Sequence, residues 1–488
     1  MTEENLYARL QRGFPADRGK AALVVPGGRS LSWRDLEALV GRLANVLLGR
    51  GLRPGDRVAA QIEKSAEAVA LYLACLKASL VYLPLNTAYT PSEIAYFLDD
   101  AEPGLFVCDG VRSPTVPTLT LAELLAADAS AEGPIHPARA DDLAALCYTS
   151  GTTGRSKGAM LTHRNLSSNA ETLVKLWGFV PGDVLLHALP IFHVHGLFVA
   201  LHTALLNGST LLFLPKFDAG QVLELMPQAS VMMGVPTFYT RLLDEPGLTA
   251  ERCRHMRLFV SGSAPLLAET HKAFEARTGQ AILERYGMTE TGMLASNPLH
   301  GPRRAGTVGR PLPDVELRIA DESGRALPQG EVGSVEVRGP NVFPGYWRRP
   351  EQRAKDFRPD GFFITGDIGV IEPDGYLALV GRAKDLIISG GYNVYPKEIE
   401  LVLDAIPGIG ESAVVGLPHR DFGEGVTAFC TVSGQAPVEA AVIAECRRAL
   451  AAYKVPKRVL FLDSLPRNAM GKVQKAKLRE QHSGLYAR

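Results

Sequence analysis

The first hundred residues alternate between helix-type and strand-type hydrophobic patterns, and this alternation constrains the fold more than any other feature. Leu31–Arg50 carries apolar side chains at helical spacing, with Ser32 placed to cap the helix. After a Gly/Pro-containing turn come a short apolar strand, Arg57–Gln61, a second helical stretch, Ser65–Leu80, and another strand, Val81–Leu85. This rhythm predicts an α/β fold with largely parallel sheets.

The pattern changes in the second half of the chain. Val315–Ile319 and Ser334–Arg338 alternate between polar and apolar residues, which is typical of half-exposed antiparallel strands, and Gly361–Leu379 continues this pattern. Helix and strand signals then resume in Pro396–Ile406, Glu411–Gly416 and Val438–Ala451. We therefore expect a large N-terminal domain, residues 1–383, of doubly wound sheets with a β-barrel-like part. A small, mobile α+β C-terminal domain, residues 384–488, should follow.

Composition excludes several classes of function. The 488 residues include 52 Lys and Arg against 52 Asp and Glu, and this balance argues against a broad nucleic-acid or membrane-binding surface. The most apolar stretches are interrupted by charged residues, histidines or prolines, so none predicts a membrane span. Six scattered cysteines without a CxxC pair, and an N-terminus unlike a secretory signal, favour a reducing, cytoplasmic location.

The strongest single motif is a Ser/Thr/Gly-rich loop, Tyr148-Thr-Ser-Gly-Thr-Thr-Gly-Arg-Ser-Lys-Gly158. It follows the apolar run Leu143–Cys147 and precedes a helix expected to begin near Thr162. Gly151 and Gly154 permit tight turns in which backbone N–H groups can face phosphate oxygens. Hydroxyl donors and a positive charge come from Thr149, Ser150, Thr152, Thr153 and Lys157. The loop does not fit the GxxxxGK[ST] pattern, so we expect a phosphate site outside the P-loop NTPases.

Further motifs follow the loop in a fixed order. They are Leu189-Pro-Ile-Phe-His-Val-His-Gly196, Tyr286-Gly-Met-Thr-Glu-Thr-Gly292, Thr365-Gly-Asp367, Gly381-Arg-Ala-Lys-Asp385, Gly390-Gly-Tyr-Asn-Val394 and Pro466-Arg-Asn-Ala-Met-Gly-Lys472. With the loop, this set resembles the adenylate-forming superfamily of acyl-CoA synthetases, adenylation domains and luciferases over essentially the whole chain. The segments Ser261–Pro265, Leu283–Met293 and Arg304–Gly309 are most similar to malonyl-CoA synthetases.

The resemblance implies a two-step reaction that uses ATP, Mg²⁺ and coenzyme A. A carboxylate attacks the α-phosphate of ATP, which gives an acyl-adenylate and pyrophosphate, and the CoA thiol then displaces AMP. Lys157 and the loop hydroxyls would hold the β- and γ-phosphates, and Glu290 would help to place Mg²⁺. Thr289 would lie beside the α-phosphate, with Tyr286 near the adenine. Other positions implied around the nucleotide are Gly262, Ser263, Ala264, Pro265, Glu284, Gly287 and Met288, with Asp367 and Arg382 at the ribose.

The resemblance also assigns roles near the C-terminus. Lys472 would be the catalytic lysine that bridges the carboxylate and the α-phosphate, and its Pro-x4-Gly-Lys frame resembles the target of bacterial lysine acetyltransferases. Lys384 matches the family's hinge, about which the C-terminal domain would rotate between the two half-reactions. The loop Gly390, Gly391 and Tyr392 would then line the path of CoA.

Arg285 is the candidate determinant of the acid substrate. By the same resemblance, its guanidinium would hold the distal carboxylate of a small dicarboxylate, with His193 and Ser261 as helpers and Met293 shaping the wall. His195 is a weaker candidate for the same wall. The alternative interpretation is a surface arginine paired with Glu284.

The expected product is malonyl-CoA or methylmalonyl-CoA, two possibilities that the sequence leaves open because the acids differ by one methyl group. A broad medium-chain acyl-CoA synthetase and a free-standing adenylation protein are the alternatives. A non-catalytic nucleotide-binding relative is disfavoured, because Lys157, Glu290, Asp367, Arg382 and Lys472 are all present.

Overall fold

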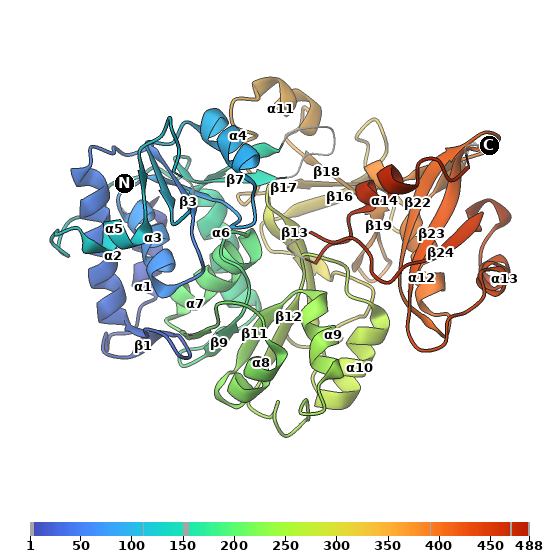
Figure 1. Ribbon diagram of the computed structural model, residues 1–488, viewed down its shortest axis with the longest axis horizontal. Coiled ribbons are helices and arrows are strands. Elements are labelled where there is room, and N and C mark those ends of the chain that lie inside the picture. Colours follow the sequence, from blue (N-terminus) through green and yellow to red (C-terminus); the bar gives the residue numbers. More distant parts are fainter. Residues whose placement is uncertain (1–3, 111, 150–155, 391, 469–470, 487–488) are drawn as a thin grey trace. The chain divides into compact units, whose positions relative to one another are not determined.

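The computed structural model describes residues 4–110, 112–149, 156–390, 392–468 and 471–486, which form a mixed α/β structure as predicted (Figure 1). The chain divides into two compact units. Met1–Glu316 and Val337–Phe363 form the first, and Leu317–Glu336 and Ile364–Arg488 form the second. This division differs from the predicted boundary at residue 384, because the strands just before that residue group with the C-terminal part. The hinge at Lys384 stays a prediction.

The first unit contains two sheets whose central strands are parallel. In spatial order, the nine-stranded sheet comprises β15 (Arg310–Pro311), β14 (Gly292–Ser296), β13 (Leu283–Met288), β12 (Leu258–Ser261), β11 (Val231–Gly234), β9 (Val184–His187), β10 (Thr210–Phe213), β1 (Ala21–Val24) and β2 (Leu31–Ser32). All neighbours from β13 to β1 pair in parallel, and the outer pairs are antiparallel. The sequence rhythm predicted this parallel core correctly.

The second sheet of this unit has six strands. They are β6 (Thr118–Leu119), β5 (Leu105–Cys108), β3 (Arg57–Gln61), β4 (Val81–Pro84), β7 (Leu143–Thr149) and β8 (Lys157–Thr162), in spatial order. Only the edge pair β7–β8 is antiparallel. The phosphate loop predicted from the sequence therefore joins two antiparallel strands at one edge of this sheet.

Helices cover both sheets. In the first unit they are α1 (Leu6–Arg12), α2 (Trp33–Gly49), α3 (Ala66–Lys77), α4 (Pro91–Ala101), α5 (Leu121–Ala126), α6 (His163–Leu176), a π-helix η2 (His195–Ala200), α7 (Leu201–Asn207), α8 (Ala219–Leu225), η3 (Met226–Gln228), α9 (Pro236–Asp244), α10 (Ala268–Thr278) and α11 (Pro350–Asp356). Ser32 caps α2, as its position predicted, and Ser65 caps α3. Helix α6 contacts both β8 and β14, so it lies between the two sheets.

The second unit is smaller. Its four-stranded sheet is ordered β16 (Glu316–Ala320), β17 (Gly333–Arg338), β18 (Phe363–Ile371) and β19 (Leu377–Arg382). Its five-stranded sheet comprises β21 (Tyr392–Val394), β20 (Ile387–Ser389), β23 (Gly423–Val432) and β22 (Ile409–His419), with β24 (Arg458–Phe461) beside β23. The helices are η4 (Ala383–Asp385), α12 (Pro396–Asp404), α13 (Glu439–Ala449), η5 (Ala452–Lys454) and α14 (Lys475–His482). The alternating pattern predicted the antiparallel pair β18–β19 correctly.

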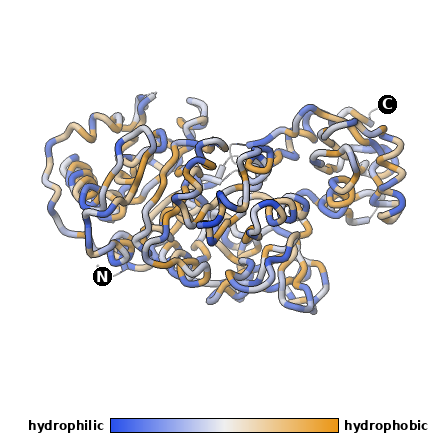
Figure 2. The backbone as a smooth tube through the Cα atoms, turned by 90° about the horizontal axis from the view of Figure 1, so that it is seen from below, coloured by the Kyte–Doolittle hydropathy of each residue, from blue (hydrophilic) through white to orange (hydrophobic). Residues whose placement is uncertain are grey.

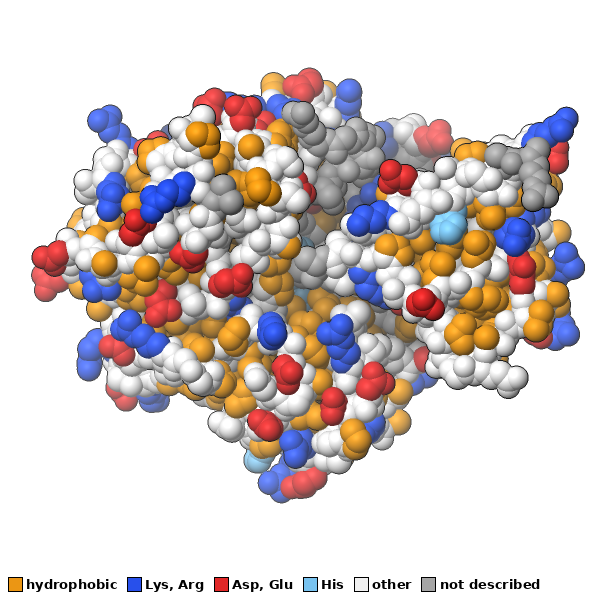
Figure 3. Space-filling model, viewed as in Figure 1, with side chains coloured by type: hydrophobic (Ala, Val, Ile, Leu, Met, Phe, Trp, Pro, Cys, Tyr) orange, Lys and Arg blue, Asp and Glu red, His pale blue; other side chains and the backbone are white. Residues whose placement is uncertain are grey.

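Apolar residues are distributed along the whole chain, as the hydropathy colouring in Figure 2 shows. One large cluster packs α8, α9 and α10 against the nine-stranded sheet, with Tyr239, Phe259 and Phe274 fully buried. On the face shown in Figure 3, acidic and basic side chains are interspersed, in keeping with their equal numbers. All six cysteines are buried, and none of them forms a disulfide bond.

Among the described residues, no helix combines the length and the apolar character needed to cross a bilayer.

Several histidines of the first unit are buried in their neutral form, which predicts acid sensitivity. Desolvation lowers the pKa of His163 to about 4 and that of His202 to about 3. An unfolded histidine titrates near about 6.5, so below that pH the unfolded chain binds protons that the native chain does not. The free energy of unfolding should therefore fall as pH drops from about 6.5 towards 4, by up to about 1.4 kcal/mol per pH unit for each such histidine.

Urea unfolding followed by tryptophan fluorescence at several pH values tests this expectation. The matched variant is His163→Asn, because asparagine can still accept the hydrogen bond that the Leu6 N–H donates to His163 Nδ1 at 3.0 Å. The variant should show a shallower loss of stability with acid. Identical pH dependence in both proteins would contradict the assignment of His163 as a neutral buried group.

Candidate functional site

The ends of the predicted phosphate loop are fixed by the β7–β8 hairpin. Thr149 and Lys157 are cross-strand register partners, so a hydroxyl and an ammonium group flank the loop. The predicted loop residues Ser150, Gly151, Thr152, Thr153 and Gly154 lie outside the described residues. The helix expected near Thr162 begins there, with Thr162 as its N-cap. The sequence interpretation missed strand β8, which precedes that helix.

Glu290 is the acidic group beside this hairpin. It is only 5% exposed, and its Oε1 accepts hydrogen bonds from the Tyr346 hydroxyl at 2.8 Å and from Thr149 Oγ1 at 3.3 Å. The Lys157 Nζ lies 5.1 Å from the centre of the Tyr346 ring. Burial, and next the charge of Glu290, raises the pKa of Tyr346, which keeps its hydroxyl protonated as a donor. A carboxylate, an ammonium group and two hydroxyls therefore converge at the base of the loop.

Tyr346 was not identified from the sequence. It lies in a segment that pairs with β8, where the Trp347 N–H donates to Gly158 O at 2.8 Å. The only local signal is the Pro344-Gly-Tyr-Trp347 run, in which two aromatic residues follow a Pro-Gly pair. Such a signal does not reveal that the phenol would meet a carboxylate more than fifty residues earlier in the chain.

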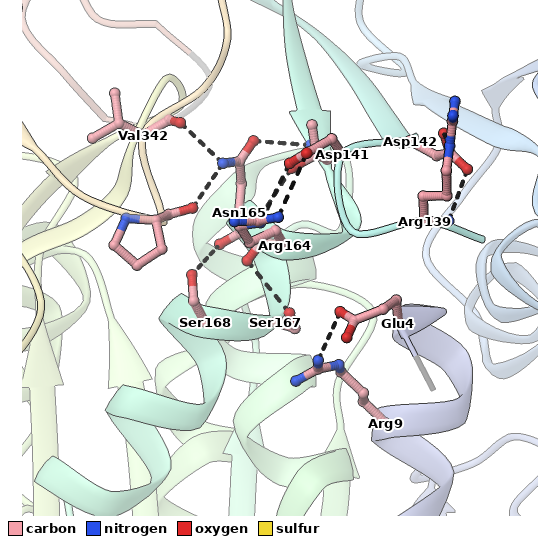
Figure 4. A network of polar contacts seen from close by, with 12 residues as sticks. Glu4, Arg9, Arg139, Asp141, Asp142, Arg164, Asn165, Ser167, Ser168 and Val342 are labelled. Carbon is pink, nitrogen blue, oxygen red and sulfur yellow. Dashed lines mark hydrogen bonds and ion pairs between the residues drawn. The ribbon is translucent and has the colours of Figure 1, made fainter. Parts of the chain in front are cut away.

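The first turn of α6 holds the loop that leads to Tyr346 (Figure 4). Asn165 Nδ2 donates to Pro340 O and to Val342 O, each at 2.9 Å, while its Oδ1 accepts from the Thr162 N–H at 3.0 Å. The next residue of that loop, Phe343, donates its N–H to Glu290 O at 2.8 Å. Asn165 thus connects the N-cap of α6 to this loop. Phe343 of the loop is in turn hydrogen-bonded to the backbone of Glu290, the candidate catalytic carboxylate.

Arg285 is buried within strand β13, a short distance before Glu290 in the sequence. Its residue exposure is 3%, and neither Nε nor Nη2 has a hydrogen-bond partner among the described residues. Desolvation lowers the pKa of this guanidinium. Gly262, on the neighbouring strand, leaves the space, because a Cβ there would lie 2.4 Å from Arg285 Cζ. The structure therefore contains a desolvated guanidinium whose Nε and Nη2 donors make no hydrogen bond to a described residue.

The register of β12 and β13 separates Arg285 from its predicted neighbours. Ser261 and Glu284 are register partners in this parallel pair, so they share one face of the sheet, and Arg285 lies on the other. Glu284 Oε1 accepts the Leu266 N–H at 3.0 Å, which fixes the turn after β12. The surface pairing of Arg285 with Glu284 is wrong, since both are buried on opposite faces. A pocket role for Ser261 and a nucleotide role for Glu284 stay predictions.

His195 reaches the surroundings of Arg285. It is buried, its Nδ1 lies 3.2 Å from Ser263 Oγ, and its pKa is lowered well below the usual value by desolvation first and by the charge of Arg285 next. His193 is partly buried, and its Nδ1 accepts the His195 N–H at 3.3 Å. The structure thus places His195, the weaker sequence candidate, beside the guanidinium. The role of His193 stays a prediction.

Met293 and the residues of the turn after β12 are further predicted positions of the first unit, and the role of Met293 in the pocket wall stays a prediction. Met293 is buried on β14, and its backbone N–H donates to Asn169 Oδ1 at 2.9 Å. Ser263 has a φ of +71°, a left-handed conformation that costs a non-glycine residue about 1–2 kcal/mol. The other predicted nucleotide residues Ala264, Pro265, Tyr286, Gly287, Met288 and Thr289 lie at or just beyond the carboxyl ends of β12 and β13. Ligands of parallel α/β sheets commonly bind at this edge.

The second unit carries its own cluster of predicted residues. Asp367 and Arg382 are register partners in β18 and β19, and Arg382 Nε contacts Asp367 Oδ1 at 2.7 Å. Lys384 follows immediately in η4. Tyr392 is 57% exposed and stacks on Tyr453, with 4.6 Å between ring centres. Gly390 has a φ of +59° beside it, and Gly391 lies outside the described residues.

Lys472 is exposed at the end of a tight turn in this unit. Its backbone N–H donates to Asn468 Oδ1 at 3.0 Å, and the Asn468 N–H donates to Lys472 O at 3.0 Å. The backbone of the predicted catalytic lysine is therefore held by one asparagine. Although the residue as a whole is exposed, desolvation of its ammonium group first, and the charge of Arg382 next, lowers the pKa of Lys472 to about 8.

Comparison with known proteins agrees with these motifs. The profile of the AMP-binding enzyme family matches residues 11–347, and that of the AMP-binding enzyme C-terminal domain matches residues 398–472. A malonate–CoA ligase of Arabidopsis thaliana is 35% identical, covering 88% of this chain and 79% of the relative. A feruloyl-CoA synthase of an Amycolatopsis species is 37% identical, covering 94% and 96%. The crystal structure of ATP-bound MatB from Rhodopseudomonas palustris is 54% identical, with a TM-score of 0.95 and 99% of each chain covered.

The packing of Arg285 over Gly262 predicts a strong coupling between the two positions. Gly262→Ala should destabilise the first unit by roughly 1–3 kcal/mol, because its Cβ would lie 2.4 Å from the guanidinium carbon. In Arg285→Ala the same glycine substitution should cost much less, since the obstructing side chain is gone. A double-mutant cycle measured by urea unfolding gives the coupling energy.

Gly49→Ala is the matched control, because a Cβ at Gly49 meets no heavy atom within 4 Å. This control should leave the free energy of unfolding almost unchanged. Additive effects of Gly262→Ala and Arg285→Ala would show that the two residues do not share the space.

Proposed function

This chain belongs to the AMP-binding enzyme family, and from that premise we propose that it is a malonate–CoA ligase. Membership of this family makes it an adenylate-forming acyl-CoA ligase, which activates a carboxylic acid with ATP and transfers the acyl group to coenzyme A. The proposed substrate is malonate, or methylmalonate, which has one further methyl group. The observation that carries this choice is the buried Arg285, whose guanidinium keeps two donors without a partner among the described residues.

A desolvated arginine is an expensive feature unless a ligand completes it. Burying an unpaired charge costs several kcal/mol, and the cost is recovered when an anion accepts its hydrogen bonds. A guanidinium fork matches a carboxylate, which can accept two parallel N–H bonds. Malonate has a second carboxylate about one carbon from the reacting one, so it can satisfy Arg285 while the other carboxylate reacts. Acetate and fatty acids would leave the guanidinium unpaired.

Neighbouring groups support an anionic ligand. His195 beside Arg285 is neutral, because desolvation and the charge of Arg285 lower its pKa. It therefore offers a hydrogen bond without adding a second buried charge. Among the described residues, no carboxylate forms an ion pair with Arg285, and Glu284 is engaged by the Leu266 N–H on the opposite face. The pocket thus keeps its positive charge for the substrate.

The nucleotide end of the site opposes the negative charge of ATP. Lys157 and Thr149 flank the phosphate loop, where an ammonium and a hydroxyl suit the β- and γ-phosphates. Glu290 fits a Mg²⁺ ion, since it is a buried carboxylate positioned by two hydroxyl donors, and Mg²⁺ prefers one or two carboxylates together with phosphate oxygens. When bound, this ion would neutralise phosphate charge. Thr289 precedes Glu290 and would face the α-phosphate.

The second unit supplies the remaining proposed roles. Asp367, held by Arg382, would accept hydrogen bonds from the ribose hydroxyls. Lys472 would offset the charge of the carboxylate and the α-phosphate as they approach each other. Lys384 would be the pivot of the unit, and Gly390 and Tyr392 would lie along the path of the CoA thiol. These roles rest on the family motifs.

Two other substrate classes define the comparison for an assay. A broad medium-chain acyl-CoA synthetase would prefer octanoate, and a free-standing adenylation protein would form adenylates without transferring the acyl group to CoA. CoA-dependent AMP formation from acetate, malonate, methylmalonate, succinate, octanoate and benzoate distinguishes all three. Malonate or methylmalonate should give the highest kcat/KM.

Arg285→Ala should cripple the use of malonate. Loss of the fork should lower kcat/KM for malonate by about 10³ or more, because the distal carboxylate would be buried without partners. ATP binding should change little, and Arg285→Lys should rescue poorly, since lysine lacks the planar fork. Steady-state kinetics with each acid, and calorimetry with ATP, measure these effects.

Arg303→Ala is the matched control for Arg285. Desolvation lowers the pKa of Arg303 too, but its guanidinium donates to backbone carbonyls such as Leu299 O at 3.0 Å. Its loss should affect stability without changing the ratio of malonate to octanoate activity. If Arg285→Ala retained malonate kcat/KM within about threefold, the distal carboxylate would be held elsewhere.

Lys472→Ala should separate the two half-reactions. Adenylate formation from malonate and ATP should be abolished, while thioester formation from supplied malonyl-adenylate and CoA should persist, because the lysine is proposed to act only in the first step. Pyrophosphate release and thioester formation are measured separately. Equal losses in both assays would refute this division of labour. We also propose Lys472 as the target of a lysine acetyltransferase, which would remove the same charge.

A further inference from the structure

A partly buried lysine, Lys64, contacts the strand that leads to the acid pocket and forms no ion pair with a described carboxylate. Lys64, in the turn between β3 and α3, places its Nζ 2.9 Å from His187 Nδ1 and 2.8 Å from His187 O. The same ammonium lies 4.2 Å from the centre of the Phe213 ring. No described aspartate or glutamate forms an ion pair with Lys64, and desolvation lowers its pKa well below the usual value. A desolvated ammonium group without a carboxylate partner lowers stability, so we expect Lys64 to have a function that offsets this cost.

The two ring contacts of His187 fix one tautomer. A carbonyl oxygen can only accept, so Gly196 O requires the ring proton on the nitrogen that faces it, and His187 Nδ1 is left to accept from Lys64. The ring proton then sits on Nε2, which lies 2.9 Å from Gly196 O, an atom that can only accept. Both contacts are satisfied in the Nε2–H tautomer and in no other neutral form. Desolvation first, and then the charge of Lys64, lowers the pKa of His187, so the ring stays neutral.

Gly196 O is a structurally demanding acceptor. It lies in the π-helix η2, where it also accepts the Leu201 N–H, the i to i−5 bond of the π turn. Gly196 is pressed against the preceding chain, because a Cβ there would lie 2.1 Å from Pro190 O. The His187 ring therefore stabilises an uncommon helical turn that has little room to shift.

This turn begins with His195, the residue beside Arg285. We propose that Lys64 is a positioning residue for the acid pocket: by donating to His187 Nδ1 and His187 O, it holds the ring that supports the π turn, and this turn presents His195 to the guanidinium of Arg285. The proposal rests on the proposed function, because the pocket it serves is the one assigned to the acid substrate. Lys64 acts through His187 and Gly196, and the substrate need not touch it.

The competing interpretation is that Lys64 only fills space, and the chain offers a matched control for it. Lys77, at the end of α3, is likewise partly buried, lies 5.9 Å from the centre of the Tyr7 ring, and has its pKa lowered by desolvation. The aromatic ring that Lys77 contacts, Tyr7, belongs to α1, and none of the described contacts of Lys77 reaches η2. Lys64→Met and Lys77→Met therefore remove equivalent groups, only one of which bears on His187.

The experiment combines kinetics with a spectroscopic measurement that does not depend on the substrate. Nitrogen-15 NMR of histidine-labelled protein, with His187 assigned by His187→Gln, reports which ring nitrogen carries the proton. Wild type and Lys77→Met should show the Nε2–H tautomer with a hydrogen-bonded Nδ1, and Lys64→Met should move the Nδ1 resonance towards that of a ring nitrogen without a hydrogen bond. The kcat/KM of the best acid in the panel should fall about tenfold or more in Lys64→Met, mainly through KM, as expected for a small misplacement in the pocket. The KM for ATP should stay within about twofold.

Each outcome decides the proposal. An Nδ1–H tautomer in the wild type, or folded Lys64→Met with unchanged acid kinetics, would overturn it. Equal kinetic losses in Lys64→Met and Lys77→Met would also overturn it, because they would show that Lys64 contributes only packing. If malonate proved not to be a substrate, the proposed function would fail, while the tautomer and the effect on the preferred acid would still test Lys64.

Discussion

The buried guanidinium of Arg285 is the interaction on which the arrangement of the first unit's site depends. This cation within β13 is desolvated by its surroundings, and its neighbours differ from ordinary core residues in ways that this charge explains. Gly262 has no side chain, and this leaves the space that the guanidinium occupies. His195 stays neutral beside it, and Glu284 is kept on the far face of the sheet. The protein preserves an unsatisfied charge here instead of neutralising it.

One short stretch of chain carries both the arginine proposed to bind the acid and the carboxylate proposed to place Mg²⁺. Arg285 lies within β13, and Glu290 follows just after that strand, so their separation is set by a few residues of backbone. The position of Glu290 is fixed again from outside, by the Tyr346 hydroxyl and by the Phe343 N–H of the loop that Asn165 holds. The two proposed ends of the site therefore share one structural support, which suits chemistry that depends on positioning two anions against each other.

The contact between Lys64 and His187 extends the same logic away from the reacting groups. Its direction follows from donor and acceptor chemistry alone: the ammonium donates, the imidazole relays, and a carbonyl of the π turn accepts. Three polar groups that would each be costly in isolation are satisfied as a chain. Like Arg285, Lys64 is a desolvated basic group for which the described residues provide no carboxylate, although its side chain is only partly buried. Around this pocket, basic groups without carboxylate partners among the described residues lower the stability of the fold, and their contacts fix the positions of neighbouring groups.

The sequence by itself determined the fold class, the parallel sheets, the cap at Ser32 and the positions of the motifs, because hydrophobic periodicity and turn chemistry are local. It also singled out Arg285, Lys157 and Glu290 through their motifs. Only the tertiary structure decided that Arg285 is buried away from Glu284, that Tyr346 meets Glu290, and that Lys64 reaches His187. These contacts join residues separated by up to 123 positions. They depend on strand order, register and the face each side chain takes, none of which is written in the neighbouring residues.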